Sequence, residues 1–377
     1  MRGQATVKEL IESAVDAGVV PGAVVAAGRW TAEPVLLHVA GDAQCHDGQG
    51  DDGQGHDGQG DDAARRPMTE GTVFDLASLT KIVATTPIVL HLVGAGEVGL
   101  DDPARRYLAA FSGPRGSGSG GRDEVTVRQL LTHTSGLPDT RNYHEHGRDA
   151  AEVRAAALAE PLVTAPGTIC CYSDIGFIAL GELAAAVAGC SLAELAQRVV
   201  CAPLGMARTR YLPPGEWAGQ VAATEAAGGT AKVGMVHDEN AAALGGVAGH
   251  AGLFGTAGDL ARYAAAWVGK DSPLAAAGLL PPGLRAAALR CQTEGLGGRR
   301  GLGWGLRGDQ WDGMGDGWPA TGAGHTGFTG TSLSIDARSG LWAVLLTNAV
   351  HYGRGPAHSV VGLRKQVHAA VVSALLG

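Results

Sequence analysis

Hydrophobic residues recur along this chain with two different periods, and each period predicts a different kind of element. From Val7 to Val15 the apolar side chains fall three to four residues apart, with charged residues on the opposite face, which predicts a helix. Thr256 stands before another apolar segment with Asp259 three residues later, the pattern of a capping box at a helix N-terminus. Helical spacing also covers residues 82–93, 126–133, 175–188, 191–200 and 357–376.

Short continuous apolar runs near both ends of the chain predict strands. Residues 22–28 and 35–40 are bounded by Gly and Pro, and residues 332–337 and 341–348 flank a turn at Arg338-Ser339-Gly340. Strands at both ends with helices between them indicate an α+β fold, in which the two ends complete one sheet and a mostly helical lobe is inserted. We expect an α/β lobe of about residues 1–75 and 245–377, and a helical lobe of about residues 76–244.

Between residues 42 and 66 the hydrophobic pattern disappears into a repeat, HDGQGDDGQGHDGQGDD. Asp/Gly repeats that wind into calcium-binding coils also place an apolar residue inside each turn, and this repeat has none. Without apolar surface to bury, such a segment stays solvated. The sequence therefore predicts a flexible insertion at 42–66.

The composition narrows the class of protein. The 377 residues are 45% hydrophobic, an ordinary fraction for a globular protein, and carry a formal net charge of −8. This acidic balance, without any Lys/Arg-rich run, gives no electrostatic footprint for nucleic acid. No apolar stretch approaches the ~20 residues of a membrane-spanning helix. We expect a soluble globular protein with neither nucleic acid nor a membrane as partner, and its oligomeric state stays open.

The first helix and the cysteines predict a cytoplasmic location. Glu9, Glu12 and Asp16 interrupt the apolar core that a secretory signal needs. Adjacent cysteines form a strained disulfide, and no CxxC pair or metal-finger spacing is present. We expect all six cysteines to be reduced thiols, as in cytosolic proteins: Cys45, Cys170, Cys171, Cys190, Cys201 and Cys291.

The first candidate chemistry lies in Phe74-Asp75-Leu76-Ala77-Ser78-Leu79-Thr80-Lys81. If Ser78 begins a helix, Lys81 lies one turn later on the same face, where its amine can approach the hydroxyl. A partly desolvated Lys can remove the serine proton, and the helix N-terminus supplies a backbone N–H for an oxyanion. S-x-x-K arises by chance on many surface helices, but the apolar flanks here indicate a buried helix.

Two later segments place polar residues at the ends of predicted elements. Tyr172-Ser173-Asp174 precedes a helix, where a tyrosine near Lys81 can pass a proton between Ser78 and a leaving group. The alternative is a core tyrosine beside a residue that caps the helix. The stretch 324–330 (GHTGFTG) precedes a strand, its glycines leave room for substrate, and a backbone N–H near Phe328 can complete an oxyanion hole.

Together these segments resemble the serine β-lactamase and penicillin-binding-protein superfamily, in particular its class C-like branch of esterases, D-amino-acid peptidases and transacylases. That family carries S-x-x-K, then Tyr-x-Asn or Tyr-Ser-Asp/Asn, then Lys-Thr-Gly or His-x-Gly. Supporting matches are residues 130–138 (LLTHTSGLP) and 249–256 (GHAGLFGT). The resemblance runs from about Pro21 to the end except the insertion, and implies an antiparallel sheet flanked by helices. The three motifs stand here as Ser78/Lys81, Tyr172/Asp174 and His325/Gly327.

The resemblance implies a mechanism without a metal or cofactor. Ser78 attacks an acyl carbonyl and forms an acyl-enzyme, and Lys81 and Tyr172 act as the general acid/base pair. The backbone N–H groups of Ser78 and Phe328 bind the oxyanion. Deacylation by water gives hydrolysis, and deacylation by an amine or alcohol gives transfer. Asp174, His325, Thr326, Gly327 and Trp304 are the expected supporting or substrate-binding residues.

Two departures from the family pattern shift the expected substrate. The penicillin-hydrolysing class C enzymes have a Lys where this chain has His325, and a neutral imidazole supplies no dependable charge for a drug's carboxylate. Asp174 replaces the usual Asn, and a carboxylate close to Lys81 favours the ammonium and shifts base catalysis toward Tyr172. With the missing signal segment, these changes favour an intracellular acyl-transfer enzyme acting on an ester or amide.

Other residues offer weaker alternatives. His133 and Ser135 stand two apart after a helix, and we expect them to shape the cleft floor rather than to act as base and nucleophile. The segment 236–240 (VHDEN) with His250 contains metal-ligand residue types, but zinc needs convergent tetrahedral ligands that the sequence does not indicate. Trp304 and Trp311 are candidates for substrate contact, with burial in the core as the alternative.

Three functions remain open from the sequence. The first is a serine hydrolase of esters or amides, an esterase, peptidase or β-lactamase-like enzyme. The second is a transacylase of a biosynthetic pathway that passes the Ser78-bound acyl group to an amine or alcohol. The third is a non-catalytic penicillin-binding-like module. The choice between water and another acceptor depends on whether the cleft excludes water, which the sequence does not reveal.

Overall fold

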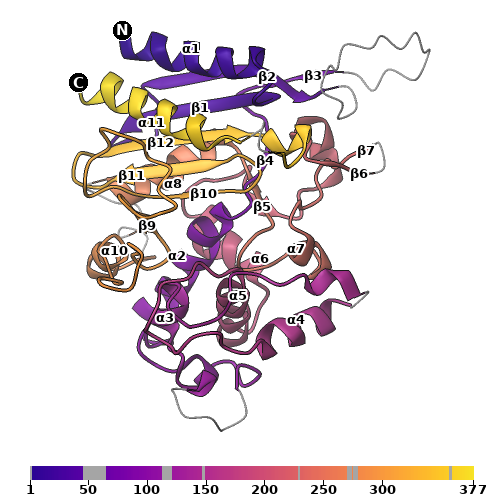
Figure 1. The fold of residues 1–377 in the computed structure, drawn as a ribbon, viewed down its shortest axis with the longest axis vertical. Coiled ribbons are helices and arrows are strands. Elements are labelled where there is room, and N and C mark those ends of the chain that lie inside the picture. The colour runs from indigo at the N-terminus through magenta and orange to yellow at the C-terminus, as the bar shows by residue number, and fades with distance from the viewer. Residues whose placement is uncertain are drawn as a thin grey trace.

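A computed structural model describes residues 2–45, 65–112, 121–146, 149–227, 230–269, 274, 279–355 and 359–377. Its central feature is a seven-stranded antiparallel sheet in the order β3-β2-β1-β12-β11-β10-β9 (Figure 1). Three strands come from the N-terminal part of the chain and four from the C-terminal part, so the α+β prediction of one sheet shared by both ends is confirmed. They are β1 (Gly22–Arg29), β2 (Leu36–Gln44), β3 (Arg66–Pro67), β9 (Gly305–Leu306), β10 (Ala323–Thr326), β11 (Ser332–Asp336) and β12 (Leu341–Thr347).

Both faces of the sheet are covered by helices. Helices α1 (Arg2–Asp16) and α11 (Val361–Leu375) lie side by side on one face, and α8 (Ala257–Val268) covers the other (Figure 1). Along β1, Val24 packs in the core on the α8 side, whereas Val25 packs in the core under α1 and α11. This two-sided burial explains why β1 is continuously apolar in the sequence instead of alternating.

The remaining helices form a second layer below the sheet (Figure 1). Thr126 caps α3 through a reciprocal capping box with Gln129, and α3 ends early because His133 adopts a left-handed backbone conformation with φ +58°. The Ser78 helix enters α2 through a π-helical segment, Lys81–Thr85, and a second one, Ala196–Cys201, follows α6. The helices are α2 (Thr86–Gly94), α3 (Val127–Leu131), α4 (Ala150–Ala159), α5 (Asp174–Ala188), α6 (Leu192–Leu195), α7 (Glu239–Ala243) and α10 (Pro282–Ala288).

Short strands join the two layers. β4, β8 and β5 form a three-stranded antiparallel sheet, and β6 pairs with β7. Because β4 leads directly to Ser78, this small sheet fixes the position of the predicted nucleophile. The strands are β4 (Phe74–Asp75), β5 (Arg210–Tyr211), β6 (Ala226–Ala227), β7 (Thr230–Ala231) and β8 (Leu253–Gly255).

Two expectations from the sequence need correction. Asp42 belongs to β2 and pairs with Pro67 of β3, so the ends of the 42–66 segment are part of the sheet, while the repeat itself lies outside the described residues. Thr256 caps α8 by accepting a hydrogen bond from Asp259 N, but the capping box is incomplete. The Asp259 carboxylate instead accepts bonds from the Arg208 backbone N–H at 2.7 Å and the Thr209 hydroxyl at 2.9 Å.

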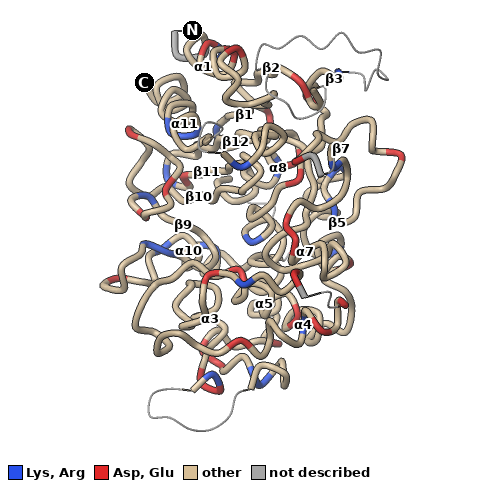
Figure 2. The backbone as a smooth tube through the Cα atoms, turned by 45° about the vertical axis from the view of Figure 1, so that its right-hand side comes forward, with Lys and Arg blue, Asp and Glu red and all other residues tan. Residues whose placement is uncertain are grey.

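Charged residues are not concentrated on one surface (Figure 2), and the cysteines form no disulfides in the described residues. Basic and acidic positions are interspersed over both layers in the described part of the chain (Figure 2). All six cysteines are free thiols. No single helix in the described ranges is long and apolar enough to cross a membrane, although the bent pair Asp174–Ala188 and Leu192–Cys201 passes that test of length and composition together.

Candidate active site

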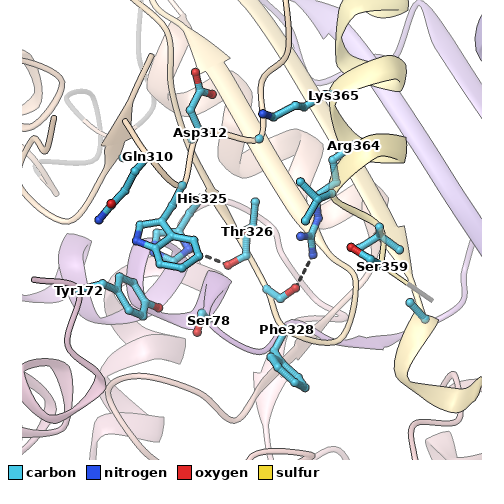
Figure 3. Close-up of a pocket in the computed structure, with 18 of the residues that line it drawn as sticks. Ser78, Tyr172, Gln310, Asp312, His325, Thr326, Phe328, Ser359, Arg364 and Lys365 are labelled. Atoms are coloured by element: carbon cyan, nitrogen blue, oxygen red, sulfur yellow. Dashed lines mark hydrogen bonds between the residues drawn. The ribbon is translucent and has the colours of Figure 1, made fainter. Parts of the chain in front are cut away.

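Ser78 is presented by a tight turn between β4 and the helix that follows. Ala77 adopts a left-handed conformation with φ +47°, which is unfavourable for a residue with a Cβ. The buried Asp75 carboxylate compensates, because it accepts hydrogen bonds from Ala77 N at 2.8 Å and from His237 N at 2.7 Å. The turn is thereby tied to the 236–238 loop, and Ser78 lies at the mouth of a pocket (Figure 3).

Lys81 is fully buried directly behind Ser78. Its Nζ donates to Ser78 Oγ at 3.0 Å and to His250 O at 3.1 Å, and forms an ion pair with Asp174 Oδ1 at 2.7 Å. Burial lowers the pKa of Lys81, but the attraction of Asp174 and of Tyr172 outweighs it, so that the pKa is raised overall. Two hydrogen-bond acceptors and the paired Asp174 carboxylate surround the amine, and Lys81 rests as an ammonium ion.

Tyr172 lies on the other side of Ser78 from Phe328 (Figure 3). Its ring centroid is 4.9 Å from Lys81 Nζ, and the phenol interacts with both the Lys81 amine and the Ser78 hydroxyl. Burial and the neighbouring Asp174 raise the pKa of Tyr172, and this outweighs the opposite effect of Lys81 and Ser78. Tyr172 therefore rests protonated, and the structure brings together the three residues that the motifs predicted.

Two histidine rings flank the tyrosine. The centroids of His133 and His325 lie 4.7 Å and 5.8 Å from that of Tyr172. His133 Nδ1 accepts from Ser173 N at 3.0 Å, and His325 Nδ1 donates to Thr326 O at 2.8 Å. Burial, reinforced by the positive charges of Arg300 and Lys81, holds the pKa of both histidines well below the usual range. Both are neutral at pH 7. His133 holds the loop that carries Tyr172, and its contacts do not make it a base for Ser135.

The backbone N–H groups of Ser78 and Phe328 are available to a ligand. Among the described residues, no hydrogen bond uses either of them. The two turns that carry them are joined, because Thr329 Oγ1 donates to Asp75 O at 2.8 Å and Thr331 Oγ1 to Leu76 O at 3.1 Å. These bonds tie together the two turns that carry the predicted oxyanion donors.

The pocket at Ser78 has a volume of about 800 Å³ (Figure 3). Trp304 is not part of it: this side chain is fully buried and packs against Trp267, with ring centroids 4.9 Å apart, so it has no access to substrate. Trp311, from the same Gly-rich stretch, lines the pocket instead. The predicted residues that line it are Ser78, Tyr172, Asp174, His325, Thr326, Gly327 and Phe328.

Two arginines in the pocket wall escaped the sequence analysis. Arg300 is buried, pairs with Asp309 at 2.9 Å, and places its guanidinium 5.6 Å from the Tyr172 ring centroid. Arg364 of α11 donates to Gly327 O and so holds the loop that carries Phe328. For Arg364 a signal was available, since it follows Leu363 in an apolar helical pattern, whereas Arg300 stands between Arg299 and Gly301 and no apolar flank predicted its burial.

The metal-ligand residue types near residue 237 are engaged with one another. His237 Nε2 lies 3.0 Å from Glu225 Oε2, and His250 Nε2 lies 2.9 Å from Asp238 Oδ1. The ranges that the structure describes contain no group of three or more His, Cys, Asp or Glu side chains placed to hold a metal ion. These pairs instead brace the pocket wall.

Replacing Asp75 with Asn is expected to slow acylation of Ser78 about tenfold. The variant should also lose the acid limb of the pH–rate profile, the fall in acylation rate at low pH. Burial raises the pKa of Asp75 to about 6. The hydrogen bonds from His237 and Ala77 oppose this rise, and the nearby charges of Asp238 and Lys232 make smaller contributions of opposite sign. As the pH falls through about 6, protonation removes one of the two acceptors and the turn loosens, so activity should fall with it. The measurement is the acylation rate against pH.

The control for Asp75 is Asp101→Asn, which removes an exposed carboxylate paired with Arg128. This variant should keep the acid limb of the parent. An Asp75→Asn variant with an unchanged limb would show that another group causes it. The free energy of unfolding should change with pH in the opposite direction to activity. Because the pKa of Asp75 is raised on folding, its contribution to stability is full below pH 3.8 and is lost as the pH rises through about 6.

Comparison with known proteins adds independent information to this geometry. A family model described as "Beta-lactamase" matches residues 7–361. A putative D-alanyl-D-alanine carboxypeptidase of Escherichia coli (strain K12) is 30% identical over 311 residues, which cover 75% of this chain and 70% of that protein. An N-acetylmuramyl-L-alanine amidase of Bacillus subtilis (strain 168) is 32% identical over 321 residues, covering 76% and 70%.

Solved structures share the fold at lower identity. EstCE1, a hydrolase with promiscuous acyltransferase activity, superposes with a TM-score of 0.72 at 22% identity over 98% of each chain. A class C beta-lactamase mutant superposes with a TM-score of 0.74 at 21% identity over 99% of this chain and 98% of that one. At these identities the similarity concerns the arrangement of sheet and helices.

Proposed function

Because the chain belongs to the beta-lactamase family, a family of serine hydrolases and acyltransferases, we propose that it hydrolyses esters or amides through an acyl-enzyme on Ser78. The observation that carries the proposal is the contact of Lys81 Nζ with Ser78 Oγ at 3.0 Å in a buried site beside Tyr172. A buried amine in contact with a serine hydroxyl is costly for stability and useful for chemistry.

In the proposed first step, Ser78 Oγ bonds to the acyl carbon and its proton passes to the Lys81–Tyr172 pair. The developing oxyanion accepts hydrogen bonds from the backbone N–H groups of Ser78 and Phe328. The pair then returns the proton to the departing alcohol or amine as the carbon–oxygen or carbon–nitrogen bond breaks. Water attacks the acyl-enzyme by the reverse sequence.

The proposed base must lose one proton before it acts, since both Lys81 and Tyr172 rest protonated. The acylation rate should therefore rise with pH, and the apparent pKa of this rising limb belongs to the Lys81–Tyr172 pair rather than to either residue. Asp174 raises the pKa of both partners, which places this limb at higher pH.

Asp174→Asn is expected to move the rising limb toward lower pH and to speed acylation at pH 7 several-fold. The amide removes the negative charge that holds the proton on Lys81. Acylation rates with p-nitrophenyl acetate across pH measure the change, and Asp101→Asn serves as the matched loss of a paired carboxylate outside the pocket. A limb that stays in place, or moves to higher pH, contradicts this role of Asp174.

Labelling with a fluorophosphonate tests the proposed function. We expect one covalent adduct per chain, located at Ser78 by peptide mass spectrometry and abolished in Ser78→Ala. A folded protein without any adduct would overturn the proposal and favour a non-catalytic binding module. Transfer is separated from hydrolysis by adding amines and alcohols during p-nitrophenyl ester turnover: an acceptor that accelerates turnover and appears in the product identifies a transacylase.

His325→Lys is expected to raise acylation by carboxylate-bearing β-lactams several-fold relative to a neutral ester. Burial keeps His325 neutral, whereas a lysine brings a positive charge beside the pocket. The ratio of the two acylation rates is the measurement, and His144→Lys, outside the pocket lining, is the control. An unchanged ratio would mean that charge at this position does not limit β-lactam use.

A further inference from the structure

We infer that the substrate of the Ser78 site carries a bulky apolar group, of aryl or branched-alkyl size, that packs against Trp311 and Phe328. The inference rests on the proposed acyl-enzyme function and names its substrate class. It differs from what the names of the two relatives suggest, since those proteins are named for a D-alanyl-D-alanine and an N-acetylmuramyl-L-alanine substrate.

The first observation is where large apolar side chains are exposed. Trp311, Phe328 and Val361 are 64%, 63% and 54% exposed, and all three line the pocket that contains Ser78. Large exposed apolar side chains gathered in one concave place mark a binding surface, whereas scattered ones do not. Met314, Val350 and Val360 extend the same lining.

The second observation is that Phe328 is held in place despite its exposure. Its ring stacks on His237, with centroids 5.7 Å apart and an interplanar angle of 24°. The Arg354 guanidinium lies 5.7 Å from the ring centroid and is itself fixed by Glu225 at 2.7 Å. A rigid aromatic surface loses little entropy when a ligand covers it, so it is prepared for binding.

Trp311 is held by a separate set of contacts. Its backbone N–H donates to Asp309 Oδ1 at 2.9 Å, and the same carboxylate oxygen pairs with buried Arg300. Gly313 allows the other end of this short loop to approach Thr326 closely, because a Cβ there would lie only 2.9 Å from Thr326 Cγ2. The loop thus lies directly against the strand edge beside His325, and Trp311 forms a wall of the reaction pocket.

The size of the pocket agrees with a large substituent. A volume of about 800 Å³ falls in the range of pockets that enclose drug-sized ligands, far more than an acetyl group fills. An apolar group that covers both aromatic rings would be transferred from water into the pocket, and each methylene buried in this way favours binding. This binding energy is gained near the reacting carbonyl, so it should appear in the acylation rate.

The test compares two fluorophosphonates that differ only in one substituent, methyl against phenylethyl. In each, Ser78 Oγ bonds to phosphorus, the serine proton passes to the Lys81–Tyr172 pair, and fluoride leaves. We expect the second-order labelling rate of Ser78 to be at least about tenfold higher for the phenylethyl probe. In Trp311→Ala, and again in Phe328→Ala, this ratio should fall to about threefold or less.

The control is Val163→Ala, which shortens a side chain of 56% exposure outside the pocket and should keep the parent ratio. Equal labelling by both probes, or a ratio that neither Trp311→Ala nor Phe328→Ala changes, overturns the inference while leaving the acyl-enzyme function intact. Absence of any adduct at Ser78 overturns the proposed function itself, so the two failures are distinguishable.

Discussion

Replacing Lys81 with alanine is expected to slow acylation of Ser78 by a factor on the order of 10² or more. The amine contacts the serine oxygen at 3.0 Å and, with Tyr172, accepts the serine proton in the proposed mechanism. Its loss removes the amine half of the pair that takes up this proton. The burst of p-nitrophenol from a p-nitrophenyl ester under pre-steady-state conditions measures the acylation step alone.

Stability must be followed in the same variant, because Lys81 is fully buried and pairs with Asp174 at 2.7 Å. Removing one partner leaves the carboxylate uncompensated, so the thermal midpoint should also fall. Two measurements separate chemistry from folding: Lys8→Ala, an exposed lysine on α1, should act like the parent, and added propylamine should restore part of the Lys81→Ala rate. Near-normal acylation in folded Lys81→Ala would remove lysine from the mechanism.

Replacing Tyr172 with phenylalanine is expected to slow acylation to a similar degree, on the order of 10² or more. The substitution removes one oxygen and keeps the ring that packs between His133 and His325. Folding should be nearly unchanged, so the loss reports the phenol itself. The same burst measurement applies, and acylation close to that of the parent would assign Tyr172 to packing alone.

Tyr143→Phe is the matched control, because it removes a buried tyrosine hydroxyl that donates a hydrogen bond to Glu160 Oε2 at 2.9 Å and lies outside the pocket. A stability loss of about 1 kcal/mol and parent-like acylation are expected there. The double variant Lys81→Ala with Tyr172→Phe should lose little more than either single one, since residues that handle one proton act as a unit. Fully additive losses would show that the two residues serve separate steps.

Local sequence determined the elements and the order of the reactive groups. Apolar runs near the two ends predicted β1, β2, β11 and β12, and the signal was clearest for β1 and β12, whose burial on both faces favours apolar residues along the whole strand. The three-residue spacing of Ser78 and Lys81 placed the amine beside the hydroxyl, since one helical turn sets that distance. The family motifs supplied Tyr172, which periodicity alone assigned equally well to the core.

Tertiary structure decided which distant residues meet. Trp304 and Trp311 stand in the same Gly-rich stretch, and only the packing of Trp304 on Trp267 buries one and leaves the other in the pocket. Asp75 and Arg300 likewise gain their partners, the 237 backbone and the Tyr172 ring, from segments far along the chain. A periodic pattern records which face of an element is buried, whereas the identity of the neighbour depends on how the elements pack together.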